Sequence, residues 1–223
     1  EMTSSLVGSE MCIRDRLYSF SRNPRALLQE AREIIAGCIH AAPEEIFFTS
    51  GGSESDNWAV KGLLEKDDYR QTVTSSFEHH AILHSCETIE RLGFPVSYVS
   101  PDHSGHVTVD ALARVLTKKT KLVSIMLSNN ELGTIQPIKE LCEIAHAHGA
   151  LFHTDAVQSM GHIPIDVREL GVDMMSASSH KFNGPKGIGF LYLRKGTRIR
   201  PYMDGGAQER GLRAGTELSL IHI

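Results

Sequence analysis

Short apolar runs alternate with amphipathic stretches along most of this chain. The apolar runs predict strands, and apolar positions at helical spacing between them predict helices. Strands are expected at residues 46–49, 72–76, 96–99, 122–127, 151–154, 172–177 and 188–193, and helices at 23–41, 53–66, 80–92, 109–116 and 137–148. This alternation predicts an α/β fold in which a mostly parallel sheet has helices on both faces.

The boundaries of the expected helices carry recognisable signals. Asn23 followed by Pro24 can cap the first helix, and Ser53 can cap the second one after the turn Ser50-Gly51-Gly52. Gly93 and Gly149 stand where two later helices should stop. These signals support the division of the chain into alternating elements.

Polar residues collect directly after the apolar strands. In sheets of this kind a ligand lies outside the carboxyl ends of the strands. Five separate groups of polar residues at such positions therefore predict one shared site. The groups are Gly51-Gly52-Ser53, Glu78-His79, Asn129-Asn130-Glu131, Asp155 with Gln158, and Ser178 to Lys181.

Lys181 is the most informative of these residues. It lies between two apolar runs, in the sequence SASSHKFNGPKG. A lysine in apolar surroundings is unfavourable unless it is paired, neutral or covalently bound. Desolvated lysines form Schiff bases with carbonyl groups, so a carbonyl cofactor is one hypothesis. The alternative is an ordinary turn lysine at a strand end, and the neighbouring groups have to decide between the two.

The other groups each allow a ligand role and a structural one. Gly52 and Ser53 at a helix N-terminus suit a phosphate, although a capped helix start would explain them too. Asp155 could keep a pyridine nitrogen protonated or could cap a helix. Gln158 follows within reach of a substituent on such a ring.

A histidine and an amide complete the set. His79 could stack on a flat ring and transfer protons near neutral pH. Asn130 could donate to a phenolate or carboxylate, or could belong to a plain turn. His80 and His84 are four residues apart but lack a third ligand, so no metal site is expected.

Composition removes several classes of function. Of the 223 residues, 41% are hydrophobic and 22% charged, which is ordinary for a globular protein. The net charge of -4, without a basic block, does not indicate nucleic acid or an anionic membrane as partner. No apolar stretch approaches the ~20 residues that span a bilayer. The four cysteines, Cys12, Cys38, Cys86 and Cys142, form no Cys-x-x-Cys pair, which favours a reducing cytoplasm.

The two ends of the chain lack the pattern of the middle. Residues 1–16 and 218–223 show no clear periodicity and are interpreted as non-native sequence. Residues 17–217 are then one large domain, which we expect to be incomplete, without a small C-terminal domain.

Taken together, these segments resemble the cysteine desulfurases of the class V aminotransferase family, which are pyridoxal 5'-phosphate (PLP) enzymes of the aspartate-aminotransferase-like fold. The resemblance runs from about Leu17 to Glu217 and is closest to the iron–sulfur and nitrogen-fixation branch. It depends on the whole set in its order: FFTSGGSESDN, FEHHAIL, SIMLSNNELGTIQPI, HTDAVQS, SSHKFNGPKGIGFLY and GGAQERGLRAGTE.

The resemblance implies a role for each candidate residue. Lys181 would hold PLP as a Schiff base, Asp155 would pair with its ring nitrogen, and His79 would stack on the ring and act as an acid or base. Gln158 and Asn130 would bond the ring near its phenolic oxygen. The phosphate would be held by Gly52, Ser53, Ser178 and His180, and Thr216 would reach the phosphate of the partner subunit in a homodimer.

The implied activity converts L-cysteine to L-alanine and leaves its sulfur as a persulfide on an enzyme cysteine, for iron–sulfur cluster assembly or another sulfur-acceptor protein. Ser53 stands where many relatives have threonine, and Ala207 where many have glycine. The acceptor cysteine and the substrate-carboxylate arginine of the family lie downstream of Thr216, so the chain is expected to be a fragment that is inactive alone. Another class V PLP enzyme, such as a selenocysteine lyase or an aminotransferase, is the nearest alternative. A non-enzymatic nucleotide-binding domain and a fragment that does not fold stably also stay open.

Overall fold

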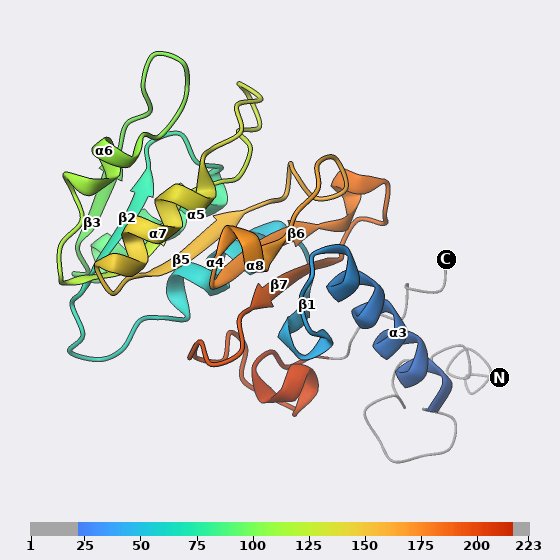
Figure 1. Cartoon of the computed structure of the whole chain (residues 1–223). Coiled ribbons are helices and arrows are strands. Elements are labelled where there is room, and N and C mark those ends of the chain that lie inside the picture. Colours follow the sequence, from blue (N-terminus) through green and yellow to red (C-terminus); the bar gives the residue numbers. More distant parts are fainter. Residues whose placement is uncertain (1–21, 216–223) are drawn as a thin grey trace.

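The described part of the chain, residues 22–215 of a computed structural model, is built around a seven-stranded sheet (Figure 1). Its strand order is β1-β7-β6-β5-β4-β2-β3. β7 is antiparallel to both of its neighbours and the other pairings are parallel, so the expected mostly parallel sheet is confirmed. The strands are β1 (Ile46–Thr49), β2 (Gln71–Ser75), β3 (Val96–Val99), β4 (Thr120–Ser124), β5 (Leu151–Asp155), β6 (Met174–Ser178) and β7 (Gly189–Leu193).

Helices cover both faces of this sheet. One face packs against α3 (Arg22–Cys38), α6 (Val109–Ala113), α7 (Ile138–Ala147) and α8 (Val167–Leu170), and the other against α4 (Gly52–Lys61) and α5 (His80–Arg91). The alternation of side chains along β1 shows the division, because Phe48 joins the first core and Phe47 the second. The Phe47 ring lies nearly perpendicular to the fully buried Trp58 ring of α4, with 5.8 Å between the centroids.

The expected strands all occur, with shifts of a few residues at their ends. Several helices are shorter than predicted, and α4 ends at Lys61 rather than Lys66, with Gly62 as its C-cap residue. The first helix begins at Arg22, so Asn23 is not its cap. The prediction missed four short elements, which are α8 and the 3₁₀ helices η2 (Pro43–Glu45), η3 (Ser179–Phe182) and η4 (Gln208–Gly211).

A buried ion pair joins the beginning of the described chain to its end. Arg32 of α3 donates through Nη1 and Nη2 to the Glu209 carboxylate of η4, at 2.9 and 2.8 Å. The two side chains are only 7% and 0% exposed. Glu209 also accepts from the backbone N–H of Phe48, and Arg210 lies over the Phe47 ring at 3.9 Å. Residues 205–215, called the Gly- and Arg-rich segment from here on, are therefore held against β1.

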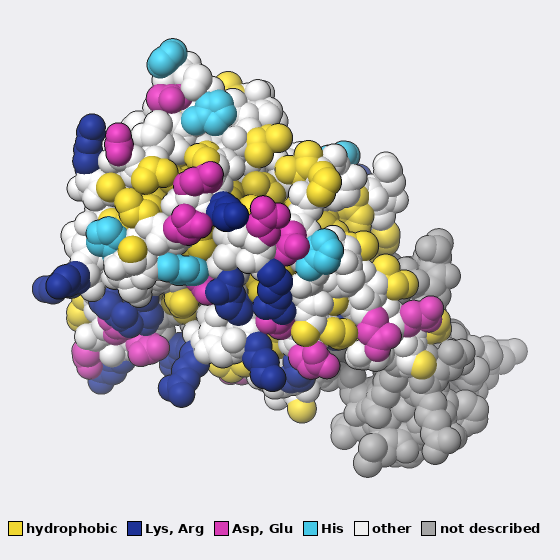
Figure 2. Space-filling view, viewed as in Figure 1, with side chains coloured by type: hydrophobic (Ala, Val, Ile, Leu, Met, Phe, Trp, Pro, Cys, Tyr) yellow, Lys and Arg dark blue, Asp and Glu magenta, His cyan; other side chains and the backbone are white. Residues whose placement is uncertain are grey.

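The surface shown in Figure 2 mixes acidic and basic side chains over most of its described area, in keeping with the small net charge. Within residues 22–215, none of the helices has the length and apolar character needed to cross a membrane.

Candidate active site

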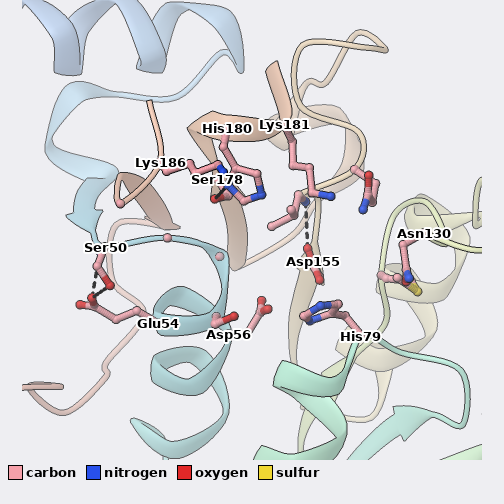
Figure 3. Close-up of a pocket in the computed structure, with 17 residues that line it drawn as sticks. Ser50, Glu54, Asp56, His79, Asn130, Asp155, Ser178, His180, Lys181 and Lys186 are labelled. Carbon is pink, nitrogen blue, oxygen red and sulfur yellow. Dashed lines mark hydrogen bonds between the residues drawn. The ribbon is translucent and has the colours of Figure 1, made fainter. Parts of the chain in front are cut away.

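A cavity of about 440 Å³ opens at the carboxyl ends of the parallel strands (Figure 3). Residues that follow β1, β2, β4, β5 and β6 line it, as expected from the five polar groups. The predicted residues that line it are Gly52, Ser53, His79, Asn130, Asp155, Gln158, Ser178, His180 and Lys181. Thr216, the remaining candidate, lies outside the described residues.

Lys181 stands on η3, directly after β6. Ser179 donates through Oγ to the carbonyls of Pro185 and Ile188, which closes the turn around the lysine. Asn183 ends η3 in the left-handed region, with φ of 65°. This rigid turn aims the Lys181 side chain into the cavity, toward Asp155 and His79 (Figure 3).

The N-terminus of α4 forms another wall of the cavity. Gly51 is the N-cap residue and offers no side-chain cap, so the predicted cap role of Ser53 is wrong; Ser53 lies in the first helical turn. Free N–H groups in that turn and the helix dipole favour an anion. Ser178 lies beside Gly51 and Gly52, and its Oγ is hydrogen-bonded to His180 Nδ1 at 2.9 Å. This wall can therefore hold a phosphate.

Glu54 fixes the entrance to this helix. Its carboxylate accepts from the Ser50 N–H at 2.9 Å and from Arg213 Nε at 2.7 Å. Burial raises the pKa of Glu54, but the bonds from Arg213 and Ser50 outweigh it and hold the pKa below its ordinary value. Glu54 is thus an anion that ties the Gly- and Arg-rich segment to the rim of the cavity.

Asp155 is the carboxylate at the end of β5 and is 4% exposed. Its Oδ1 accepts from the Val157 N–H at 2.8 Å. Burial raises the pKa of Asp155 to about 6, against the Val157 bond and the positive charge of Lys181, which lower it. Above that pH the buried carboxyl group of Asp155 is an anion, which suits a cationic partner.

His79 caps α5 with its own side chain. Nδ1 accepts from the Ala81 N–H at 3.1 Å, so the proton of the neutral ring belongs on Nε2. Burial, then His80 and Lys181, lower the pKa of His79. A neutral imidazole at the cavity can donate from Nε2 without carrying charge.

The adjacent residues Asn129 and Asn130 have different environments. Asn129 is buried and donates to the Phe77 carbonyl at 2.9 Å, and its Oδ1 accepts from the backbone of the following turn. Asn130 is exposed and faces the cavity. The amide available to a ligand is therefore that of Asn130.

Sequence reasoning missed three charged residues that line the cavity, namely Glu54, Asp56 and Lys186. Asp56 is 1% exposed, and its carboxylate lies within 4.8 Å of a carboxylate oxygen of Asp155 and a ring nitrogen of His79. A signal existed, since Asp56 is four residues after Gly52 and so shares its helix face.

Comparison with known proteins gives a consistent family. The family model described as aminotransferase class-V matches residues 9–217. A cysteine desulfurase IscS from Dictyoglomus turgidum is 52% identical over 203 residues, which cover 90% of this chain and 52% of that protein. The chain thus spans about half the length of the curated relatives it matches.

Two solved structures are similar to this chain in fold as well as in sequence. A NifS-like protein superposes with a TM-score of 0.90 at 39% identity and covers 95% of this chain, which covers 61% of that one. The structure described as SspA in complex with cysteine gives a TM-score of 0.91 at 39% identity, with 96% of this chain and 65% of that chain covered.

Proposed function

Because the chain belongs to the class V aminotransferase family, we propose that it is the cofactor-binding part of a cysteine desulfurase that uses PLP. The proposed reaction breaks the Cβ–S bond of L-cysteine and forms an S–S bond to an enzyme thiol. Alanine leaves with a new proton on Cβ, so cysteine and thiol become alanine and persulfide without an outside oxidant. The observation that carries the proposal is the single cavity in which Lys181, Asp155 and His79 meet.

The residues of the cavity fit PLP. Its wall offers a lysine amine, a buried carboxylate and a helix N-terminus without a side-chain cap, which match an aldehyde, a ring nitrogen and a phosphate. A residue larger than glycine has little room at position 52, because its Cβ would lie 2.5 Å from Val157 Cγ2. When bound, PLP supplies an electron sink for the carbon next to the substrate's amino group.

Each side chain has a definite task in this proposal. Lys181 would hold the cofactor covalently through Nζ, and Asp155 would keep the proton on its ring nitrogen. His79 would lie against the ring and present its Nε2 proton. Asn130 and Gln158 would orient the ring from its phenolic side, whereas the phosphate would be held by Gly52, Ser53, Ser178 and His180.

The thiol that receives the sulfur is assigned to a residue outside the described part of the chain. Among residues 22–215, no cysteine lines this cavity. Cys86 and Cys142 are buried, and burial raises the pKa of each thiol to about 12, far above that of a reactive thiolate. Cys38 is exposed but borders a different cavity. A homodimer, with Thr216 reaching the partner's phosphate, and a sulfur-acceptor protein complete the proposal.

The covalent role of Lys181 can be tested directly. The purified chain is mixed with PLP, reduced with borohydride and mapped by peptide mass spectrometry. We expect a visible absorption band before reduction and a label on Lys181, with both lost in K181A. K186A is the matched control, because Lys186 lines the same cavity, and it should keep the label. A label that maps to Lys186, or a visible band that survives in K181A, would contradict the proposal.

A further inference from the structure

Asp56 is a buried carboxyl group to which the proposed mechanism gives no task. It lies on α4 at the floor of the cavity and is 1% exposed. Its Oδ1 has no hydrogen-bond partner within residues 22–215. A buried carboxylate anion without a partner is strongly unfavourable, so the group has to be paired or neutral.

Two other acidic groups face Asp56, each from a different element. β5 brings Asp155 to within 4.8 Å of it, and the segment before α5 brings the buried Glu78. Burial raises the pKa of Glu78 to about 8, against hydrogen bonds from Ser75 and Met126. Burial first, then the charge of Asp155, raise the pKa of Asp56 well above its ordinary value, and the Ser176 hydroxyl only partly opposes them.

The histidines nearby do not supply the missing cation. His153 Nε2 lies 3.8 Å from Asp56 Oδ1, but its ring nitrogens are hydrogen-bonded to Ser176 at 2.9 Å and Ser124 at 2.8 Å. Burial lowers the pKa of His153 to about 3, so it is neutral in its place in the sheet. His79 also has a lowered pKa.

Asp56 and Asp155 therefore share one proton, and the groups around each carboxyl determine which of the two is protonated. Asp155 accepts a hydrogen bond from Val157 and is close enough to Lys181 to feel its charge, and both favour the anion. Asp56 has neither. Two neighbouring carboxyl groups in a dry site share a proton, and it stays on the one with less support for its charge.

We propose that Asp56 is a protonated, neutral acid that keeps Asp155 as the anion of the pair. Asp56 is thus a positioning residue: as a neutral acid it would keep a second negative charge away from Asp155, which would then be the anion available to the ring nitrogen. The protonation of Asp56 follows from this chain's own residues, whereas its meaning for the ring rests on the proposed function.

The first test needs no cofactor. Carbon-13 NMR of aspartate carboxyl groups, with D56N to assign the signal, follows Asp56 from pH 4 to pH 9. We expect the signal of a protonated acid at pH 7 in the parent chain. In D155N the midpoint should fall by about one pH unit or more, because a neighbouring negative charge is gone. An ionised Asp56 at pH 7 in the parent chain would overturn the proposal.

The second test uses the chain loaded with PLP and follows how its visible absorption band changes with pH. D56N replaces one neutral group with another, so the pH at which half of this change has occurred should differ from that of the parent chain by less than about 0.3 pH units. If Asp56 were an anion, its removal would lower the midpoint by about one unit or more. D155N should weaken PLP binding at least about tenfold, and the exposed D110N is the control for charge alone.

The two tests separate the inference from the function. A parent chain that shows no band at all contradicts the proposed function, yet the NMR titration still decides whether Asp56 holds the proton. Circular dichroism of D56N and D155N checks that both variants fold.

Discussion

At the scale of single residues, the sheet centre holds an acid-sensitive group in His153. It is fully buried between Ser124 and Ser176, and burial lowers its pKa to about 3. The unfolded chain would bind a proton there below pH 6.5, and the folded chain would not. The stability that His153 contributes as a neutral group is therefore lost as the pH falls from 6.5 toward 3.

We expect H153Q to remove this sensitivity, because an amide can bond both serines without taking up a proton. Between pH 6.5 and pH 4 the free energy of unfolding of the parent should fall by about 3 kcal/mol more than that of H153Q. Urea unfolding across this range measures the difference, with the exposed H84Q as control. Parallel curves for parent and H153Q would show that His153 does not titrate on unfolding.

Single residues also show what the sequence can and cannot reveal about the site. Lys181, Asp155 and His79 follow apolar strands directly, so their position at one edge of the sheet was predictable. Asp56 shares a helix face with Gly52, four residues earlier, so its place at the cavity had a local signal. Its closeness to Asp155, a residue distant along the chain, leaves no local pattern.

At the scale of elements, β7 and the N-terminus of α4 meet at two glycines. A Cβ on Gly189 would lie 2.6 Å from both Ala177 O and Gly51 Cα, and backbone atoms cannot move aside as flexible side chains do. This close contact holds the turn at Gly51, before the N-terminus of α4, against the sheet.

We therefore expect G189A to lower the free energy of unfolding by about 1–3 kcal/mol and to weaken PLP binding, because the start of α4 has to shift. G37A is the control, since nothing lies within 4 Å of its new Cβ on an exposed turn of α3. It should be neutral or gain up to about 1 kcal/mol. Urea unfolding and PLP titration measure the two effects. An unchanged PLP affinity in G189A would show that PLP binding does not depend on the contact between Gly189 and Gly51.

The sequence pattern predicted the strands and the longer helices, but it missed elements of a single turn. Strands and the longer helices follow from apolar spacing, but η3 and η4 are each four residues long, too short for a second turn to establish a pattern. The antiparallel direction of β7 is set by the turn after Lys181, which periodicity does not encode.

At the scale of the whole molecule, the pair Arg32–Glu209 joins α3 to the end of the described chain. Truncating one partner leaves the other charged and buried. R32M and E209M should therefore each lower the free energy of unfolding by about 3–5 kcal/mol. The double variant should lose less than the sum of the two, and urea unfolding of all four proteins measures this coupling. Additive losses would show that the two charges are stabilised separately.

The place of β7 between β1 and β6 has a consequence for the order of events during synthesis. β1 leaves the ribosome early, but its hydrogen-bonding neighbour is the last strand of the sheet to be made. Until Gly189 to Leu193 have emerged, β1 has no strand beside it and Gly51 has no backbone to rest on. A nascent chain stalled before β7 should therefore not bind PLP. The ability to bind PLP should appear over a few residues of chain length, once β7 has been synthesised.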